Sequence, residues 1–193
     1  MHPDEVMAVL RETGVVREGH FRLTSGMHTD LFLLCSLVQQ YPRHTERLAG
    51  ALARFFAGQG VEVVVGTAMG GVILGYEVAR ALGARAIYAE KSGDGRMVLR
   101  RGFFVRPGER ALVVEDALST GGSVRKAMAA IQPYGPVVVG VGVLVDRSAG
   151  RVQLDVPVRA LVTMDVGMWT PEECPLCRQG VPLVEPKELS GQA

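Results

Sequence analysis

The sequence lacks an excess of charge of either sign. Its 193 residues contain 21 Lys and Arg against 20 Asp and Glu, which gives a formal net charge of +1. Such a balance provides no global field that would attract nucleic acid or an anionic membrane surface. Recognition of an anion must therefore come from a local arrangement of groups, and we expect neither nucleic acid nor a membrane among the partners.

Cysteines and long apolar runs are also scarce. The three cysteines, of which Cys35 is isolated, do not form the framework of a secreted disulfide-rich domain. No stretch reaches the ~18 apolar residues that a membrane-spanning helix needs, and the N-terminal segment is acidic and amphipathic rather than basic and then apolar. We therefore expect reduced thiols and a cytoplasmic location.

What the sequence does contain is a regular alternation of strand and helix patterns. Strand-like runs, nearly all apolar, alternate with segments of helical spacing, and such strands are typical of a parallel sheet that is covered on both faces. We therefore predict an α/β fold with an open, mainly parallel sheet and helices on both faces. The strand-like runs are residues 61–66, 84–90, 111–116 and 136–147, and the helical segments between them are residues 70–83 and 121–135.

The N-terminal part follows another pattern. Residues 3–13 and 42–60 have helical spacing, and residues 19–34 between them indicate two short strands and a turn. We predict a single domain over the whole chain, 1–193. Its expected parts are a small N-terminal hood (about 1–40), a core (about 41–165) and a C-terminal extension (about 166–193).

The segment “ALVVEDALSTGGS”, residues 111–123, carries the clearest chemical signal. Its strand brings Glu115 and Asp116 to the carboxyl edge of the sheet, where open α/β folds bind ligands. The glycines of “STGG” let backbone amides converge at the start of a helix, so this turn can bind a phosphate dianion. The carboxylates are better suited to accept hydrogen bonds from neutral vicinal hydroxyls or to bind a cation. A ribose 5-phosphate has a phosphate for the turn and vicinal hydroxyls for the carboxylates.

Two other interpretations of this segment are weaker. It could be a capping turn in which Asp116 or Ser119 binds helix amides, but the strand before it and the helix after it favour the phosphate site. A nucleoside-triphosphate P-loop needs a Gly-Lys-Ser/Thr ending, and no lysine occurs from residue 92 to 125.

The same segment resembles the signature of the type I phosphoribosyltransferases, which bind 5-phosphoribosyl 1-pyrophosphate (PRPP). Five further stretches are similar to the orotate phosphoribosyltransferase family within that group, in particular to its shorter bacterial and archaeal form. They are “EGHFRLTSGMHTDLF”, “VVVGTAMGGVILGYEVARALG”, “AEKSGDGRMVLRRGFFVRPGER”, “GVGVLVDRSAG” and “CPLCRQGVPLV”. The resemblance covers nearly the whole chain. It implies transfer of ribose 5-phosphate from PRPP to orotate, which gives orotidine 5′-monophosphate and pyrophosphate in pyrimidine biosynthesis.

The resemblance also implies a cofactor, an assembly and residue roles. Mg²⁺ is expected as cofactor, held mainly through PRPP with no direct protein ligand, and a homodimer is expected to share the lid loop around Lys91. The implied catalytic residues are Glu115, Asp116 and Lys91. The implied orotate contacts are Ser119, Arg147 and Phe32. The implied PRPP-binding residues are Glu115, Asp116, Ala117, Leu118, Ser119, Thr120, Gly121, Gly122, Ser123, Lys91, Thr67 and Ala68.

Several of these residues have a plainer interpretation. The loop 66–71, which is similar to the family's pyrophosphate loop, could be an ordinary strand-to-helix turn. Lys91 could be a solvated surface charge, and Arg147 could form a structural salt bridge with Asp146 or Asp155. The chain also departs from many family members, because Thr24 and Gly70 stand where those members carry lysine.

Three further alternatives remain open at this point. Cys174 and Cys177 have the spacing of a metal knuckle, but zinc needs four ligands and the sequence has no second pair, which favours a structural Cys-Pro turn. His20 and His28 lie in the hood, where a contact from His28 to the base is conceivable. The chain could also be a nucleotide-binding or PRPP-binding regulator on the same fold, or a purine phosphoribosyltransferase.

Overall fold

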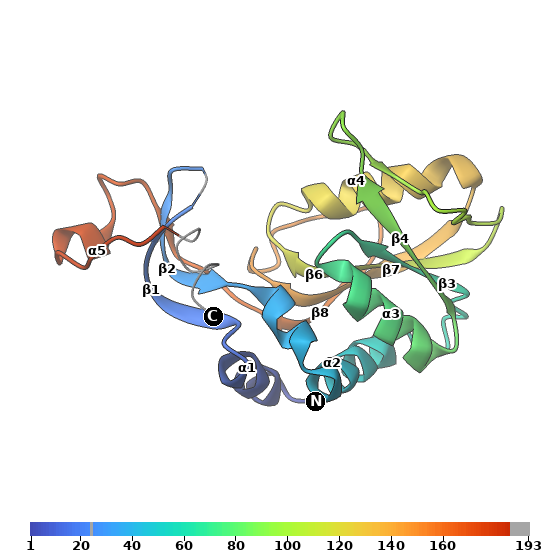
Figure 1. Ribbon diagram of the computed structural model, residues 1–193, viewed down its shortest axis with the longest axis horizontal. Coiled ribbons are helices and arrows are strands. Elements are labelled where there is room, and N and C mark those ends of the chain that lie inside the picture. Colours follow the sequence, from blue (N-terminus) through green and yellow to red (C-terminus); the bar gives the residue numbers. More distant parts are fainter. Residues whose placement is uncertain (24, 186–193) are drawn as a thin grey trace.

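A computed structural model of the chain describes residues 1–23 and 25–185. Figure 1 shows a larger α/β core and, beside it, a small sheet that lies with the C-terminal segment. The helices are α1 (Pro3–Glu12), α2 (Pro42–Ala53), α3 (Gly71–Leu82), α4 (Gly122–Ile131) and α5 (Pro175–Arg178), with short 3₁₀ turns η1 (Cys35–Gln40), η2 (Arg54–Phe56) and η3 (Gln132–Tyr134). The strands are β1 (Val16–Arg22), β2 (His28–Leu33), β3 (Val63–Thr67), β4 (Arg85–Lys91), β5 (Met97–Val98), β6 (Arg110–Leu118), β7 (Val137–Asp146), β8 (Val158–Thr163) and β9 (Met168–Trp169).

Six strands form the central sheet in the order β5-β4-β3-β6-β7-β8. Strands β4, β3, β6, β7 and β8 pair in parallel, and β5 runs antiparallel to β4. The expected open, mainly parallel sheet is therefore confirmed. β8 and β9 were not assigned from the sequence, because each is short and β8 is half exposed along its length.

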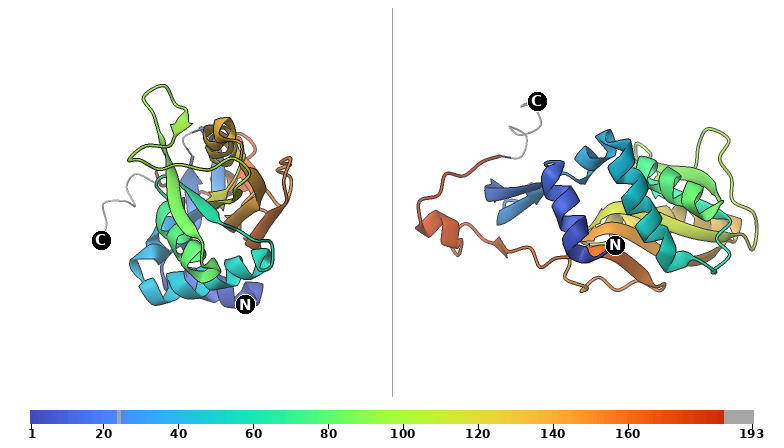
Figure 2. Two further views of the ribbon diagram at one scale, coloured as in Figure 1. Left: turned by 90° about the vertical axis from the view of Figure 1, so that its right-hand side faces the viewer. Right: turned by 90° about the horizontal axis from the view of Figure 1, so that it is seen from below.

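The two faces of this sheet are covered by different helices. Val64 of β3 packs in one buried cluster with Leu48 of α2 and Leu74 of α3. The next residue, Val65, belongs to a second cluster with Val124 of α4 on the opposite face. Because side chains alternate along a strand, a nearly continuous apolar run supplies both clusters. Figure 2 shows the sheet between these two layers.

The small sheet is antiparallel and joins both ends of the chain. β1 pairs with β2, and β9 from the C-terminal part pairs with the other edge of β2 through His28 and Trp169. A further bridge joins Phe21 to Val184. The two strands and turn expected in residues 19–34 are thus present, whereas the participation of C-terminal residues was not anticipated. The division at about residues 40 and 165 stays a proposal.

The remaining helices agree with their expected positions, with one shorter than expected. The pattern over 42–60 predicts a single helix, but α2 ends at Ala53 and continues as the 3₁₀ turn η2 before Gly58, whose φ is +78°. α1 buries its apolar face in the core cluster that also contains α2 residues. Within the described residues, no helix has the length and apolar character needed to cross a membrane.

Candidate active site

The turn between β6 and α4 has the geometry of an anion site. β6 ends at Leu118, α4 begins at Gly122, and Gly121 between them adopts the left-handed conformation with φ 78°. A β-carbon at Gly121 would lie 2.9 Å from Val152 Cγ1, so both the conformation and the space require glycine. Ser119, Thr120, Gly122 and Ser123 are exposed. The first amides of α4 lack intrahelical acceptors, as in every helix, and here they face solvent-accessible space.

The two acids that precede this turn differ in environment. Glu115 is only 7% exposed, whereas Asp116 is half-buried. Burial raises the pKa of Glu115 to about 7, and the negative charge of Asp116 adds to the effect, while a hydrogen bond from Thr67 opposes it. Near neutral pH, Glu115 can therefore both donate and accept hydrogen bonds. The pair suits the hydroxyls of a sugar better than a second anion.

The carboxylate of Asp116 lies directly over Gly70. Any β-carbon at position 70 would collide with the three atoms of that carboxyl group. One of its oxygens, Oδ1, accepts a hydrogen bond from the Ala117 amide at 2.8 Å. A side chain at position 70 would therefore require the Asp116 carboxyl group to take another conformation.

The loop of residues 66–71 makes a tight connection between β3 and α3. A β-carbon at Gly66 would lie 2.5 Å from the carbonyl oxygen of Gly71, so the loop passes very close to the start of the helix. The peptide bond between Ala68 and Met69 is cis. The Ala68 amide donates to Ala89 O at 2.8 Å, and the buried Thr67 hydroxyl donates to Val114 O at 3.4 Å. These two residues are thus held by neighbouring strands in this structure.

Arg147 lies at the carboxyl end of β7, beside the anion turn. Its amide donates to Leu118 O at 2.7 Å, which ties the two strand ends together. Burial lowers the pKa of its guanidinium group, and the buried Nε atom has no hydrogen-bond partner among residues 1–23 and 25–185. Asp146, in contrast, accepts hydrogen bonds from Ser148 N at 2.7 Å and from Gly150 N at 3.1 Å. Among the described residues, no ion pair joins Arg147 to Asp146 or Asp155, so the salt-bridge alternative is not supported.

A cavity of about 490 Å³ connects Arg147 and the anion turn with the small sheet. Residues from both parts line it, so the site lies where the hood meets the core. The lining residues are Leu23, Ser25, Ser119, Thr120, Arg147, Ser148, Arg151, Val152, Val166 and Met168.

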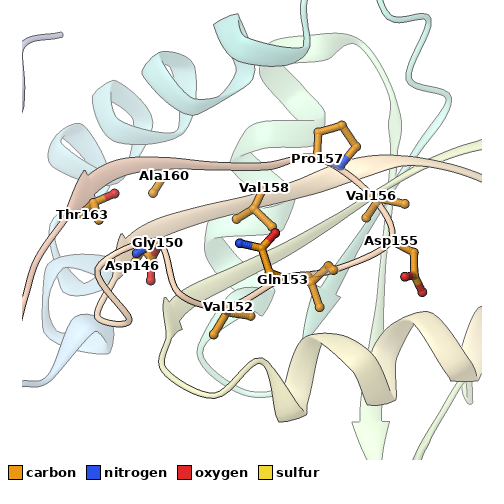
Figure 3. Close-up of a pocket in the computed structure, with 11 residues that line it drawn as sticks. Asp146, Gly150, Val152, Gln153, Asp155, Val156, Pro157, Val158, Ala160 and Thr163 are labelled. Atoms are coloured by element: carbon orange, nitrogen blue, oxygen red, sulfur yellow. The ribbon is translucent and has the colours of Figure 1, made fainter.

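A second cavity of about 490 Å³ lies at the outer edge of the central sheet, between β8 and residues 150–157 (Figure 3). It is lined by Asp146, Asp155 and Thr163 among others, but by none of the residues expected to bind PRPP or orotate. The carboxylate of Asp146 already binds local backbone amides. The cavity beside the anion turn is therefore the candidate active site.

Comparison with known proteins agrees with this geometry. Residues 38–173 match the family model described as the phosphoribosyl transferase domain. The chain is 53% identical over 186 residues to the orotate phosphoribosyltransferase of Pelotomaculum thermopropionicum, across 96% of this chain and 97% of that protein. The chain belongs to the orotate phosphoribosyltransferase family. It is also 49% identical to the Thermus thermophilus member, across 94% of this chain and 99% of the relative.

Solved structures of the family share the fold. The orotate phosphoribosyltransferase of Aeropyrum pernix has a TM-score of 0.68 at 24% identity, with 82% of this chain and 93% of that chain covered. The Mycobacterium tuberculosis enzyme, solved in complex with inorganic phosphate, has a TM-score of 0.64 at 25% identity, with 83% and 96% covered. The type I phosphoribosyltransferase fold expected from the sequence is thereby confirmed.

Of the residues expected in the site, Ser119, Thr120 and Arg147 line this cavity, whereas the others, Glu115 and Asp116 among them, do not. Lys91 ends β4 and is exposed on a β4–β5 hairpin, opposite Met97. The tip of this hairpin is held against α4, because Lys126 Nζ donates to Gly95 O at 2.8 Å. Phe32 does not line the cavity, and its ring packs 5.7 Å from that of Phe21. The roles of both residues stay predictions. Thr24 lies outside the described residues.

Other residues of the site were missed from the sequence. Gln39 of η1 donates to Gly70 O at 2.5 Å and so supports the loop of residues 66–71. Cys35, also in η1, is buried close to Asp116 and Arg147, and burial raises the pKa of its thiol to about 12, with the charge of Asp116 adding to the effect. Neither residue belongs to a motif, and only the packing of η1 against β6 brings them to the site.

The raised pKa of Glu115 predicts a distinctive pH dependence of stability. Its folded-state value of about 7 exceeds its ordinary value of 4.5. Wild type should therefore lose stability relative to Glu115→Gln as pH rises from about 4.5 to about 7, by up to ~1.4 kcal/mol per unit, and the difference should be constant outside that window. Urea unfolding of the ligand-free protein at a series of pH values measures it.

Glu109→Gln is the matched control. Burial alone would raise the pKa of Glu109, but the Arg106 amide and the Arg85 guanidinium lower it below its ordinary value. Wild type should therefore gain stability relative to this variant as pH rises through the acid range, the opposite sign to Glu115. A Glu115→Gln difference that does not vary with pH would mean that the carboxyl group is not desolvated.

Proposed function

We propose that this chain transfers ribose 5-phosphate from PRPP to a ring nitrogen of orotate and releases pyrophosphate. The observation that carries the proposal is the convergence of three groups at one sheet edge. They are the exposed turn of residues 119–123, the carboxylates of Glu115 and Asp116, and the partnerless Nε of Arg147. A phosphorylated sugar and an anionic base need this combination, and the relatives named above carry the corresponding name.

The 5-phosphate would bind at the start of α4. The exposed amides and hydroxyls of residues 119–123 offer donors, and the helix dipole adds a positive end. Glu115 and Asp116 would then hold the ribose hydroxyls. In this arrangement the sugar is fixed at both ends, which restrains C1 relative to the incoming base.

The leaving pyrophosphate would lie along the loop of residues 66–71. As its bond to C1 breaks, C1 gains cationic character and the pyrophosphate gains negative charge, so catalysis depends on placing opposite charges around both. We propose Lys91, on the β4–β5 hairpin, as the cation for the pyrophosphate. The Asp116 carboxylate, which lies against Gly70, would be near the cationic centre.

Mg²⁺ is the cofactor that this chemistry suggests. Mg²⁺ prefers oxygen ligands, usually keeps several waters and is commonly held by substrate phosphates. We propose that PRPP holds most of the ion's ligands and that Asp116 and Glu115 contact it at most through the ribose hydroxyls or water. When bound, the ion would neutralise and orient the pyrophosphate.

Orotate would occupy the cavity of about 490 Å³. Arg147 presents a planar fork of donors that can bind a carboxylate or a ring carbonyl in bidentate fashion. Ser119 lines the same cavity, and Phe32 would contribute to the wall when substrate is bound. We also propose a cytoplasmic location, which the three free cysteines support.

A base panel tests the reaction directly. The protein is incubated with PRPP, Mg²⁺ and one base at a time, namely orotate, uracil, adenine, hypoxanthine or xanthine, and pyrophosphate release is followed. We expect release with orotate alone. Asp116→Asn should lower kcat by about 10²-fold or more because charge near C1 is lost, whereas Asp155→Asn, at the outer cavity, should leave it unchanged.

The panel also separates the competing functions. Release with a purine base and not with orotate would identify a purine enzyme. Tight PRPP binding without release for any base would identify a regulator on the same fold, in which case the catalytic roles of Asp116 and Lys91 would be withdrawn.

The base-binding role of Arg147 predicts a selective defect. Arg147→Lys keeps the charge but loses the fork, so KM for orotate should rise by about 10-fold or more while KM for PRPP changes little. Arg159→Lys, an exposed arginine on β8, serves as the control. Steady-state kinetics with each substrate varied in turn measures both constants. An equal rise of the two KM values would place Arg147 in general support of the fold and not at the base.

Shared sites in a homodimer predict complementation between inactive variants. Lys91→Ala and Asp116→Asn each disable the enzyme, but a mixed dimer in which Lys91 serves the partner's site contains one intact site. The isolated mixed dimer should then have about half of wild-type activity, and an unfractionated random mixture about a quarter. Co-expression with two different affinity tags isolates the mixed dimer for assay. Inactive mixed dimers would show that Lys91 acts within its own subunit, and a monomeric wild type would exclude the shared lid.

A further inference from the structure

Four potential metal ligands meet at the far end of the hood from the core. His20 on β1 and His28 on β2 face Cys174 and Cys177. Cys174 directly precedes the short helix α5, and Cys177 lies within it. One ligand atom from each residue lies within 4.8 Å of all the others. In Figure 1, α5 lies against the side of the β1–β2 hairpin that faces away from the central sheet. Cys174 lies 154 positions after His20 in the chain, and Cys177 lies 149 positions after His28.

The spacing of the ligand atoms fits one tetrahedral ion. His20 Nε2 lies 2.9 Å from His28 Nδ1 and 3.4 Å from Cys174 Sγ. Cys177 Sγ lies 3.7 Å from His20 Nε2 and 3.3 Å from His28 Nδ1. Nitrogen and sulfur atoms bound at about 2.0 and 2.3 Å to one zinc ion are roughly 3.3 to 3.8 Å apart. The four distances lie within about half an ångström of these values, and the whole cluster spans at most 4.8 Å, so a small contraction would bring all four groups onto one ion.

A neighbouring carbonyl group fixes His20 in the form that a metal requires. His20 Nδ1 lies 2.8 Å from the carbonyl oxygen of Val181, and a carbonyl can only accept, so Nδ1 carries the proton. The lone pair of Nε2 is then directed at the cluster. A ligating histidine whose second nitrogen donates to a carbonyl is the usual arrangement in metal sites.

We propose that His20, His28, Cys174 and Cys177 bind one Zn²⁺ ion. Two thiolates and two imidazoles in a tetrahedron are the ligand set of structural zinc, and four protein ligands leave no open position for substrate. Both thiols lose their protons when the ion binds. His20, His28 and Cys174 are buried, whereas Cys177 is exposed and gives the ion a path from solvent.

The ion is structural and lies outside the candidate active site. None of its ligands lines the cavity that contains Arg147. The turn between the two histidines, however, carries Leu23 and Ser25, which do line it. By joining both strands of the hairpin to α5, the ion holds this turn in place. The sequence has no second cysteine pair, but the fold brings His20 and His28 to Cys174 and Cys177, so the proposed ion replaces the plain Cys-Pro turn that the sequence favours.

Elemental analysis of the purified protein tests the proposal. The full chain is made with a tag that contains no histidine, in reducing buffer without chelator, and its zinc, iron, copper, nickel and cobalt are measured by mass spectrometry. We expect about one zinc per chain. After removal of the ion, addition of Co²⁺ should produce a visible absorption spectrum typical of a tetrahedral site with thiolate ligands. The ion-free protein should melt at a lower temperature, and Zn²⁺ but not Mg²⁺ should reverse this.

Matched variants locate the site. Cys177→Ser changes an exposed side chain and should abolish zinc retention and the cobalt spectrum while far-ultraviolet circular dichroism shows a folded core. Cys35→Ser and His44→Gln change a cysteine and a histidine elsewhere in the fold and should retain the ion. Because the zinc content of wild type is measured first, the test does not depend on any variant folding.

Three results would overturn the proposal. The first is wild type with reduced thiols that contains no stoichiometric metal and takes up no Co²⁺. The second is a Cys174–Cys177 disulfide, found by mass spectrometry, in protein purified without oxidant. The third is a Cys177→Ser variant that keeps its zinc. Stoichiometric iron or copper in place of zinc would refute the identity of the ion.

Discussion

The left-handed turn at Gly121 is the constraint on which the rest of the site depends. It ends β6 and starts α4 within three residues, which leaves the helix amides open to solvent directly after two carboxylates. No side chain fits at this position, because Val152 lies 2.9 Å from where a β-carbon would be. The connection therefore requires glycine at this position, and it places backbone amides that can donate hydrogen bonds to an anion next to two acids.

The register of the parallel sheet then brings the other groups to this turn. β6 lies between β3 and β7, so Gly66 pairs next to Val114 and Asp146 pairs with Leu118. This register brings the loop of residues 66–71 and Arg147 to the same edge of the central sheet, so no contact between the two is needed to bring them together. A shift of one residue in either pairing would turn each side chain to the opposite face of the sheet. The site therefore depends on the pairing of β3, β6 and β7 as much as on residues 111–123.

Electrostatic balance explains why two acids can lie beside a phosphate turn. Two ionised carboxylates next to an anion would repel it, but burial raises the pKa of Glu115 to about 7, so the pair carries less than two negative charges near neutral pH. Asp116 is held over Gly70 and away from the turn. A side chain at position 70 could not coexist with this position of Asp116. The glycine and the placement of the acid therefore depend on each other.

Local patterns predicted those parts of the molecule that depend on neighbours in sequence. The runs around Val64 and Val113 indicate buried strands because each strand is covered on both faces, and “EDALSTGG” contains its own strand end, turn and helix start. The pairing of β2 with β9 and the approach of Gln39 to Gly70 could not be predicted, since each joins segments by long-range packing. The search for a second metal-ligand pair failed for the same reason: spacing identifies Cys174 and Cys177, but His20 lies in another element.

The hood shows why such long-range pairs are needed in this fold. Its sheet has three strands, and among the described residues none of the largest fully buried side chains lies in β1, β2 or β9. β9 pairs with β2 over two residues only, so the sheet is close to a two-stranded hairpin, which is marginally stable at best when isolated. The buried polar residues His20 and His28 would weaken it further unless their nitrogens were bound. An ion shared with Cys174 and Cys177 satisfies them and replaces the missing core, so the turn that lines the candidate active site is held by ligands that lie outside its cavity.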